Sequence, residues 1–124
     1  MTNTRSLSSI LSEIGSTMDG LLELGKRKAE ILVRRDISGL EKLIPSEQDL
    51  VRRLEELESE RQAVPAQSDS EIELLRVTLK EKAKRIAEMN ERNRGLLRRG
   101  LDLVQYELKL FLQEGKPLVF DHRA

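Results

Sequence analysis

The chain has 124 residues, enough for one small domain, and 35% of them are charged while seven are glycine and three are proline. This composition, rich in leucine, glutamate, arginine and lysine, is typical of long amphipathic helices and predicts an all-α fold. Twenty-two basic side chains balance twenty-two acidic ones and no cysteine is present, which argues against a field that attracts nucleic acid and excludes disulfides and thiolate chemistry.

The first predicted helix covers about residues 7–36. Its apolar residues recur at alternating three- and four-residue steps for most of its length, which is the period of one helix face. The residues concerned are Leu7, Leu11, Ile14, Met18, Leu21, Gly25 and Leu32. One face is therefore apolar, and we expect it to pack against a partner helix.

The second predicted helix covers about residues 38–63 and is expected to kink or restart near Pro45, because proline donates no backbone hydrogen bond and its ring clashes with the preceding turn. Ser38 and Glu41 have the spacing of a capping box at its start. Residues 64–69 then predict a hairpin turn. Acidic side chains outnumber basic ones over 41–61, and the reverse holds over 76–99, so we expect these two arms to pair.

The third predicted helix covers residues 70–114, begins at a second capping box formed by Ser70 with Glu73 or by Ser68 with Glu71, and is followed by a flexible tail over 115–124. Its apolar stripe comprises Ile72, Leu75, Leu79, Ala83, Ile86, Asn90, Asn93, Leu97, Leu101, Val104, Leu108 and Phe111. A helix of this length extends roughly 65 Å, against about 40 Å for the second. The expected fold is thus a bundle of three long helices, in one domain over 1–114, whose last helix overhangs.

Groups that could perform catalysis are scarce. The single histidine, His122, has no second histidine with which to bind a metal, and no glycine-rich phosphate loop is present. A small helical mutase of the chorismate mutase type would need buried arginine and lysine side chains, yet no set of basic residues falls on the apolar faces. The basic residues of 80–99 have no interleaved aromatic residue to stack on bases. We therefore predict no enzyme activity, no cofactor, no metal and no nucleic-acid partner.

The aromatic residues are concentrated at one end, because Tyr106, Phe111 and Phe120 are the only three and all lie in the last nineteen residues. Leucines around them make this part of the helix apolar over more than one stripe, so a single neighbouring helix cannot cover it. We predict a partner-binding surface of Leu97, Leu101, Val104, Tyr106, Leu108, Phe111 and Leu112. Asn90 and Asn93 lie on or beside the stripe, either as buried amides that fix helix register or as an exposed polar pair.

Three runs of residues resemble the FlgN family of flagellar export chaperones over nearly the whole chain. The first is Leu21-Leu22-Glu23-Leu24-Gly25-Lys26 with Ala29 to Asp36 and Leu40; the second is Glu47, Leu50, Leu54, Leu57, Glu58 and Arg61; the third is Asn90-Glu91-Arg92-Asn93 with Leu96, Leu97, Leu101 and Val104. They are similar to the family patterns LLxLLxxKxxALxxxDxxxL, ExxLxxxLxxLExxR and NxxNxxLLxxxLxxV.

The resemblance implies a chaperone whose last helix grips the disordered C-terminal segment of hook-filament junction proteins and brings it to the cytoplasmic domain of the flagellar export gate. We expect a cytoplasmic protein without membrane insertion, because no window has the apolar length of a signal peptide core or a membrane span. We expect a monomer or weak homodimer. The alternative is a homodimeric coiled-coil scaffold or adaptor that uses the same surface against a second copy and has no export client.

Overall fold

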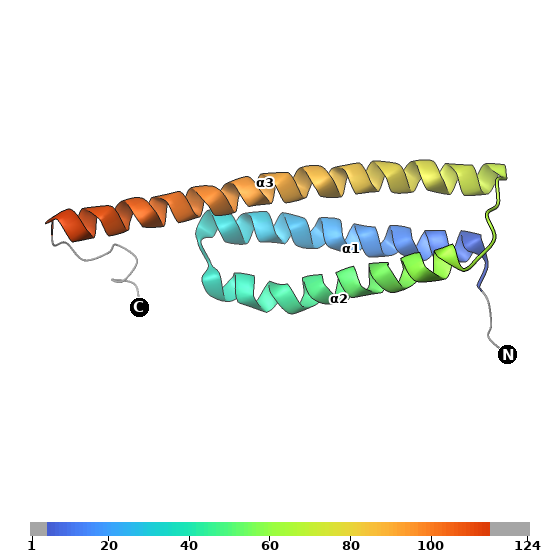
Figure 1. Cartoon of the computed structure of the whole chain (residues 1–124), viewed down its shortest axis with the longest axis horizontal. Coiled ribbons are helices and arrows are strands. Elements are labelled where there is room, and N and C mark those ends of the chain that lie inside the picture. Colours follow the sequence, from blue (N-terminus) through green and yellow to red (C-terminus); the bar gives the residue numbers. More distant parts are fainter. Residues whose placement is uncertain (1–4, 115–124) are drawn as a thin grey trace.

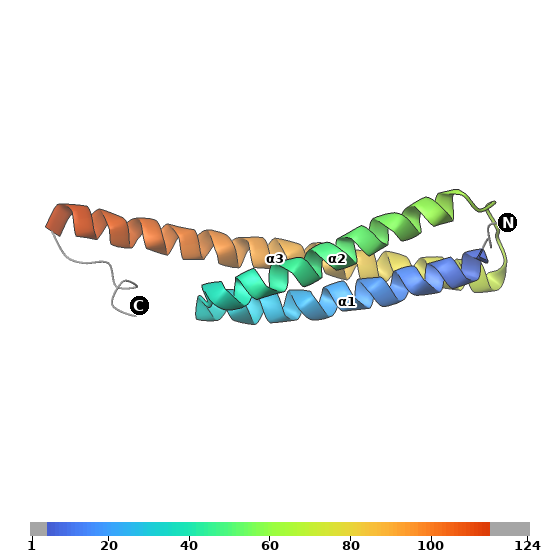
Figure 2. The same ribbon diagram turned by 90° about the horizontal axis from the view of Figure 1, so that it is seen from below.

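The computed structural model describes residues 5–114, which form three long helices and, within that range, no strand. These helices are α1 (Leu7–Arg34), α2 (Ile37–Gln62) and α3 (Ser70–Glu114), and they lie side by side with α1 in contact with both others (Figures 1 and 2). The predicted all-α bundle is confirmed. The tail expected over 115–124, with His122 and Phe120, lies outside the described residues.

α1 is the central helix of the bundle, and α3 runs parallel to it while α2 runs antiparallel. Near the starts of α1 and α3, the Ser8 hydroxyl donates to the Glu71 carboxylate at 2.8 Å. Further along both helices, the Asn93 side-chain amide donates to the Gly25 carbonyl oxygen at 3.0 Å. α2 pairs in the opposite sense, since Lys28 near the end of α1 contacts Glu47 near the start of α2.

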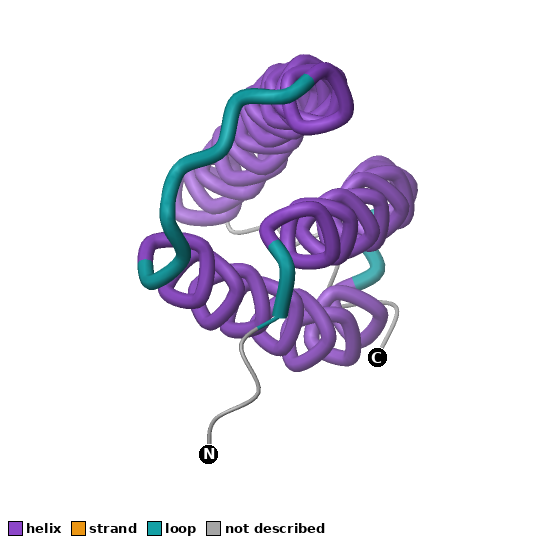
Figure 3. Tube along the Cα trace, turned by 90° about the vertical axis from the view of Figure 1, so that its right-hand side faces the viewer, coloured by secondary structure: helices purple, strands orange, loops and turns teal. Residues whose placement is uncertain are grey.

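The expected pairing of the second and third helices is wrong. α2 and α3 both pack on α1 and barely touch each other, and the loop between them spans their separation (Figure 3). Within residues 5–114, the ion pairs between helices all involve α1 or its adjoining residues: Arg5–Glu60, Arg53–Glu13, Lys28–Glu47, Lys82–Asp19 and Arg35–Glu107. Opposite net charge on two arms therefore did not decide which arms meet.

α2 and α3 begin at aspartates and not at the predicted capping boxes. The Asp36 carboxylate accepts the Gly39 amide at 2.9 Å, and the Asp69 carboxylate accepts the Ile72 amide at 2.9 Å, so each satisfies an amide of a first helical turn. α1 ends earlier than expected because Arg35 adopts a left-handed conformation, with φ of 57°, that reverses the chain. α2 continues through Pro45 without a restart.

The core lies at one end of the bundle, where all three helices contribute. Ile10, Leu57 and Ile72 are at most 1% exposed there. The other buried members are Leu7, Leu11 and Ile14, against which Met18, Leu54, Val64, Leu75 and Leu79 pack. Because α1, α2 and the start of α3 each supply side chains, this end, which we call the closed end, is the most completely packed part of the molecule.

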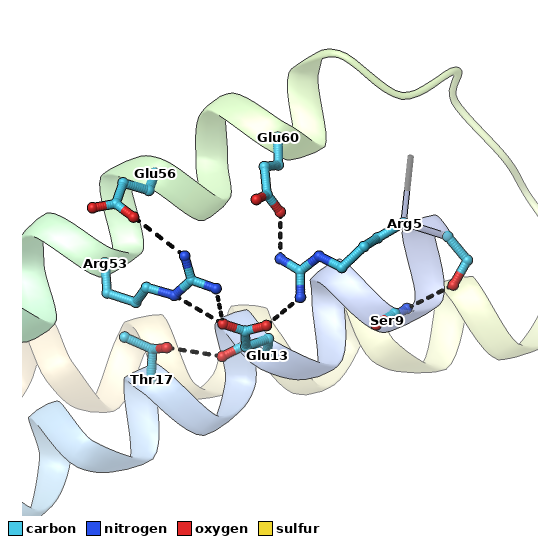
Figure 4. A network of polar contacts seen from close by, with 8 residues as sticks. Arg5, Ser9, Glu13, Thr17, Arg53, Glu56 and Glu60 are labelled. Carbon is cyan, nitrogen blue, oxygen red and sulfur yellow. Dashed lines mark hydrogen bonds and ion pairs between the residues drawn. The ribbon is translucent and has the colours of Figure 1, made fainter. Parts of the chain in front are cut away.

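Ion pairs tie α1 to α2 beside this core (Figure 4). The Glu13 carboxylate accepts from Arg5 and from Arg53, whose Nε lies 2.8 Å from it, and Arg5 also contacts Glu60. These hydrogen bonds hold the pKa of Glu13 below its usual value and raise the pKa of both arginines. The network thus fixes how α2 lies on α1 at the closed end.

Candidate functional site

α3 continues well beyond the other two helices, and we call its residues 101–114 the overhang. Gly25 of α1 lies opposite Met89 and Asn93 of α3. Because α1 ends nine residues later at Arg34, its end falls close to residue 100 of the parallel α3, and the remainder projects past both shorter helices (Figures 1 and 2). One ion pair reaches forward from the turn after α1, between Arg35 Nη1 and Glu107 Oε1 at 3.8 Å.

Large apolar side chains on and just before the overhang are exposed to solvent. Their exposed fractions are 46% for Leu97, 56% for Leu101, 44% for Leu103, 59% for Tyr106, 40% for Leu108, 38% for Phe111 and 78% for Leu112, while Val104 is half-buried. The predicted surface residues therefore lie where a partner could reach them. At the closed end, by contrast, the apolar side chains that face the other helices, such as Ile72 and Leu57, are buried.

Most of the predicted surface residues share one face of α3, but Tyr106 does not. Leu97, Leu101, Val104, Leu108 and Phe111 follow each other at steps of four, three, four and three residues, which places them along one side of a helix. Leu112 borders this side. Tyr106 lies two residues beyond Val104, about 200° around the helix, and projects from nearly the opposite side. We call the first five residues with Leu112 the apolar stripe of the overhang.

A groove of about 380 Å³ opens beside the middle of α3, in the angle that α2 and α3 leave above α1. α1 contributes Leu21, Gly25, Lys28 and Leu32, α2 contributes Glu47 and Val51, and α3 contributes Ile86, Met89, Asn90, Asn93, Arg94 and Leu97. Leu97 belongs both to this groove and to the apolar stripe. The groove therefore ends where the overhang begins.

The two asparagines that sequence analysis left open have different surroundings. Asn93 is 4% exposed and donates its side-chain amide to the carbonyl oxygen of Gly25 at 3.0 Å. Its own carbonyl oxygen, Oδ1, is buried and has no hydrogen-bond partner. Asn90 is exposed on the rim of the groove. Asn93 is thus the buried amide of the two, and it fixes the position of α3 along α1.

Close helix contact accompanies the Asn93 hydrogen bond. A Cβ atom on Gly25 would lie 1.9 Å from Met89 Sδ, so the absence of a side chain allows α1 and α3 to approach here. In this region Lys82 donates to the Gly15 carbonyl oxygen and Met89 meets Gly25, so both face α1, whereas Ala83, Asn90 and Leu97 of the predicted stripe are exposed. Of the predicted stripe here, Asn93 packs against α1, while Asn90 and Leu97 line the groove.

The charged groups named in the ion pairs above contact oppositely charged side chains of the bundle. In the described part of the chain, no group of three or more histidine or acidic side chains is placed to hold a metal ion. None of the helices within residues 5–114 combines the length and the apolar character that crossing a membrane requires. What the geometry presents instead is an apolar surface on a single projecting helix, continuous with a groove.

Comparison with known proteins decides the family. A family model described as FlgN protein matches residues 1–120. The chain belongs to the FlgN family. FlgN proteins are flagellar export chaperones and not a family of enzymes, so the resemblance seen in the sequence is confirmed and the protein is a chaperone of flagellum biogenesis. No curated protein and no solved structure gives a significant match.

Sequence reasoning missed the groove and the contacts that shape it. The groove of this FlgN-family protein exists because α2 and α3 stay apart, and charge patterning predicted the reverse. Met89 carried a usable signal, since it stands at heptad spacing after Lys82 and opposite the glycine-containing face of α1. The Arg35–Glu107 ion pair carried none, because it depends on the left-handed turn that ends α1.

Proposed function

We propose that this FlgN-family protein binds the disordered C-terminal segment of a hook-filament junction protein along the apolar stripe of the overhang. The observation that carries the proposal is the exposure of five large side chains on one face of a projecting helix: Leu97, Leu101, Leu108, Phe111 and Leu112. Contiguous exposed apolar surface of this kind marks interaction sites, and an apolar helix face is what an amphipathic client segment packs against.

The mechanism is binding without a chemical step. A client segment that folds as a helix on the stripe buries its own apolar face, so it is not available to associate with other copies of the client. The free energy of ordering the segment offsets part of the interaction energy, which keeps the complex reversible. Delivery in the cytoplasm to the cytoplasmic domain of the export gate, with transfer of the client there, completes the proposed role.

Calorimetric titration tests the proposal. We expect the C-terminal segment of a hook-filament junction protein encoded by the same genome to bind the full chain near one to one. Leu108→Ala and Phe111→Ala should each weaken binding about tenfold or more, because truncating an apolar anchor at an interface commonly costs at least about 1.4 kcal/mol. Both side chains are more than one-third exposed in the free protein, so the fold should survive either change.

Val77→Ala is the matched control. Val77 is a 63% exposed apolar residue of α3 that precedes both the groove and the overhang, so its truncation should leave binding unchanged. Absence of binding by folded wild-type protein would refute the proposal. Equal weakening by all three substitutions would show that the stripe is not the site.

A second candidate function is a homodimeric scaffold, which the four-three spacing of the stripe favours because two such stripes can pack as a coiled coil. Sedimentation velocity over a range of concentrations separates the two. A dimer that Phe111→Ala dissociates, together with no binding of the client segment, would favour the scaffold. A monomer that binds the segment would exclude it.

A further inference from the structure

The apolar stripe does not begin at the overhang. Traced backwards along α3 from Leu97, steps of three and four residues lead to Arg94 and Asn93, then to Asn90, and then to Ile86. All of these residues line the groove between α2 and α3. This face of α3 therefore runs from the groove wall onto the overhang, and at Asn93 it also contacts α1.

The groove also holds a hydrogen-bonding group that the bundle leaves unsatisfied. Asn93 is 4% exposed and lines the groove, and its Oδ1 has no partner, although its amide group is bonded to Gly25. A buried acceptor without a partner costs free energy that a donor from another molecule can recover. The lining thus combines apolar side chains with a buried acceptor, which the donor of an occupant reaches when the Asn93 side chain turns toward the groove.

We propose that the groove is the second half of the client site and receives the continuation of the client helix whose other half lies on the overhang. The proposal rests on the proposed function and specifies where the client extends. Its occupant is an amphipathic helix that places apolar side chains between Val51 of α2 and Ile86 of α3, and a hydrogen-bond donor against Asn93. From Ile86 to Leu112 the path is about 40 Å long, enough for a client helix of roughly 25 residues.

The dimensions of the groove agree with an occupant that inserts side chains from above. A volume of about 380 Å³ is at the lower end of the roughly 300–1,000 Å³ that ligand pockets occupy, so the space accepts a few side chains and not an entire helix. A helix laid across the mouth would meet α2 on one side and α3 on the other. It would take the position of a fourth helix in a bundle where α2 and α3 now share only α1.

The apolar residues 118–120 of the same chain cannot be the occupant. Glu114 ends α3, and Leu97, the nearest groove residue, is 17 residues back, a distance of about 26 Å along the helix. Six residues from Gly115 to Phe120 reach at most about 21 Å even when fully extended. We therefore assign the segment to the client, because the client already placed on the overhang is continuous with this position.

Site-specific photocrosslinking in the full chain tests the groove separately from the overhang. Benzoylphenylalanine would replace Val51 in the groove, Phe111 on the overhang, or Val77 as the control, and the probe is the C-terminal segment of the hook-filament junction protein used for calorimetry. Val51 is 42% exposed, so the replacement is compatible with folding. We expect crosslinks to the probe at positions 51 and 111 and none at 77.

The outcomes are distinguishable. Crosslinking at position 111 without crosslinking at position 51 would overturn the groove extension and leave the proposed function intact. Crosslinking at neither position would refute the proposed function as well. Crosslinks at 51 between two copies of the chain would show that a second copy occupies the groove, which also overturns the inference.

A binding measurement supplies a second readout. Val51→Glu should weaken binding of the same segment about tenfold, because the client would have to desolvate a carboxylate, while Val77→Glu should leave it unchanged. Equal affinities for the two glutamate variants would overturn the inference. Circular dichroism of each variant confirms that the comparison is made between folded proteins.

Discussion

The two ends of α3 are similar in sequence and opposite in environment. At the closed end, Ile72 is 1% exposed because α1 and α2 both reach it. Forty residues later, Leu112 is 78% exposed because neither shorter helix extends that far. α3 has 45 residues, against 28 in α1 and 26 in α2, so its last residues have no neighbouring helix to cover their apolar face. The comparison shows that helix length, as much as hydrophobic pattern, assigns the function of an apolar residue.

The largest expected effect is a loss of stability when a buried side chain is removed from the closed end. Leu57 is fully buried between α1 and α3, so Leu57→Ala should lower the free energy of unfolding by about 2 to 5 kcal/mol through lost burial and the cavity that remains. Leu112→Ala, the same substitution on the overhang, should change it by less than about 0.5 kcal/mol. Urea denaturation followed by circular dichroism measures both. Similar losses for the two variants would contradict the division into a packed end and a projecting end.

Two glycine substitutions are expected to have effects of intermediate size on the free energy of unfolding. Gly25→Ala places a Cβ atom 1.9 Å from Met89 Sδ, and the displacement of Met89 should cost about 1 to 3 kcal/mol of unfolding free energy, more than the gain of up to about 1 kcal/mol in helix propensity. Gly95→Ala meets nothing closer than Arg99 Nη2 at 3.9 Å, so only that gain should remain.

The two glycine variants should therefore shift the urea midpoint in opposite directions. Combining Gly25→Ala with Met89→Ala should produce less destabilisation than the sum of the single changes, because the shorter side chain removes the clash. Additive effects would mean that the contact between α1 and α3 at this point is looser than the structure shows.

The smallest expected effect concerns the ion pairs of the closed end. Arg5 and Arg53 lower the folded-state pKa of Glu13, so the stabilisation from this carboxylate is present above its unfolded-state pKa of about 4.5 and is lost as the pH falls through the lower folded-state pKa. Glu13→Gln should make the fall in stability below pH 4.5 shallower, as measured by urea midpoints at successive pH values. A slope unchanged by Glu13→Gln would contradict the assigned network.

Hydrophobic periodicity and composition were sufficient to predict three helices, because long amphipathic segments have a strong and local signal. The helix starts were harder to predict. Ser38 and Ser70 fit a capping pattern as well as Asp36 and Asp69 do, but the aspartates perform the capping. Which helices meet could not be predicted from charge, because surface ion pairs contribute too little free energy to choose a partner.

Part of the candidate site could be predicted from the sequence, and part could not. The apolar stripe of the overhang follows from a helix that is apolar where no partner is long enough to cover it, which sequence alone shows. Placement of Asn93 against Gly25 depends on the rotation of α3 about its axis. Asn90 lies about 60° from Asn93 around the helix, so a rotation of that size would have turned Asn90 toward α1 instead. That rotation is set by tertiary packing at Gly25 and Met89.

The central position of α1 also determines which helix contacts can form first during synthesis. α1 and α2 are adjacent in the chain and can pair early, whereas the contacts of α1 with α3 join residues 63 to 68 positions apart, such as Ser8 with Glu71 and Gly25 with Asn93. Because chains fold from the N-terminus as they are synthesised, the apolar stripe of the overhang follows the residues that complete the bundle. In a nascent chain the proposed client-binding surface is therefore synthesised last among the three helices, after the part of α3 that packs on α1.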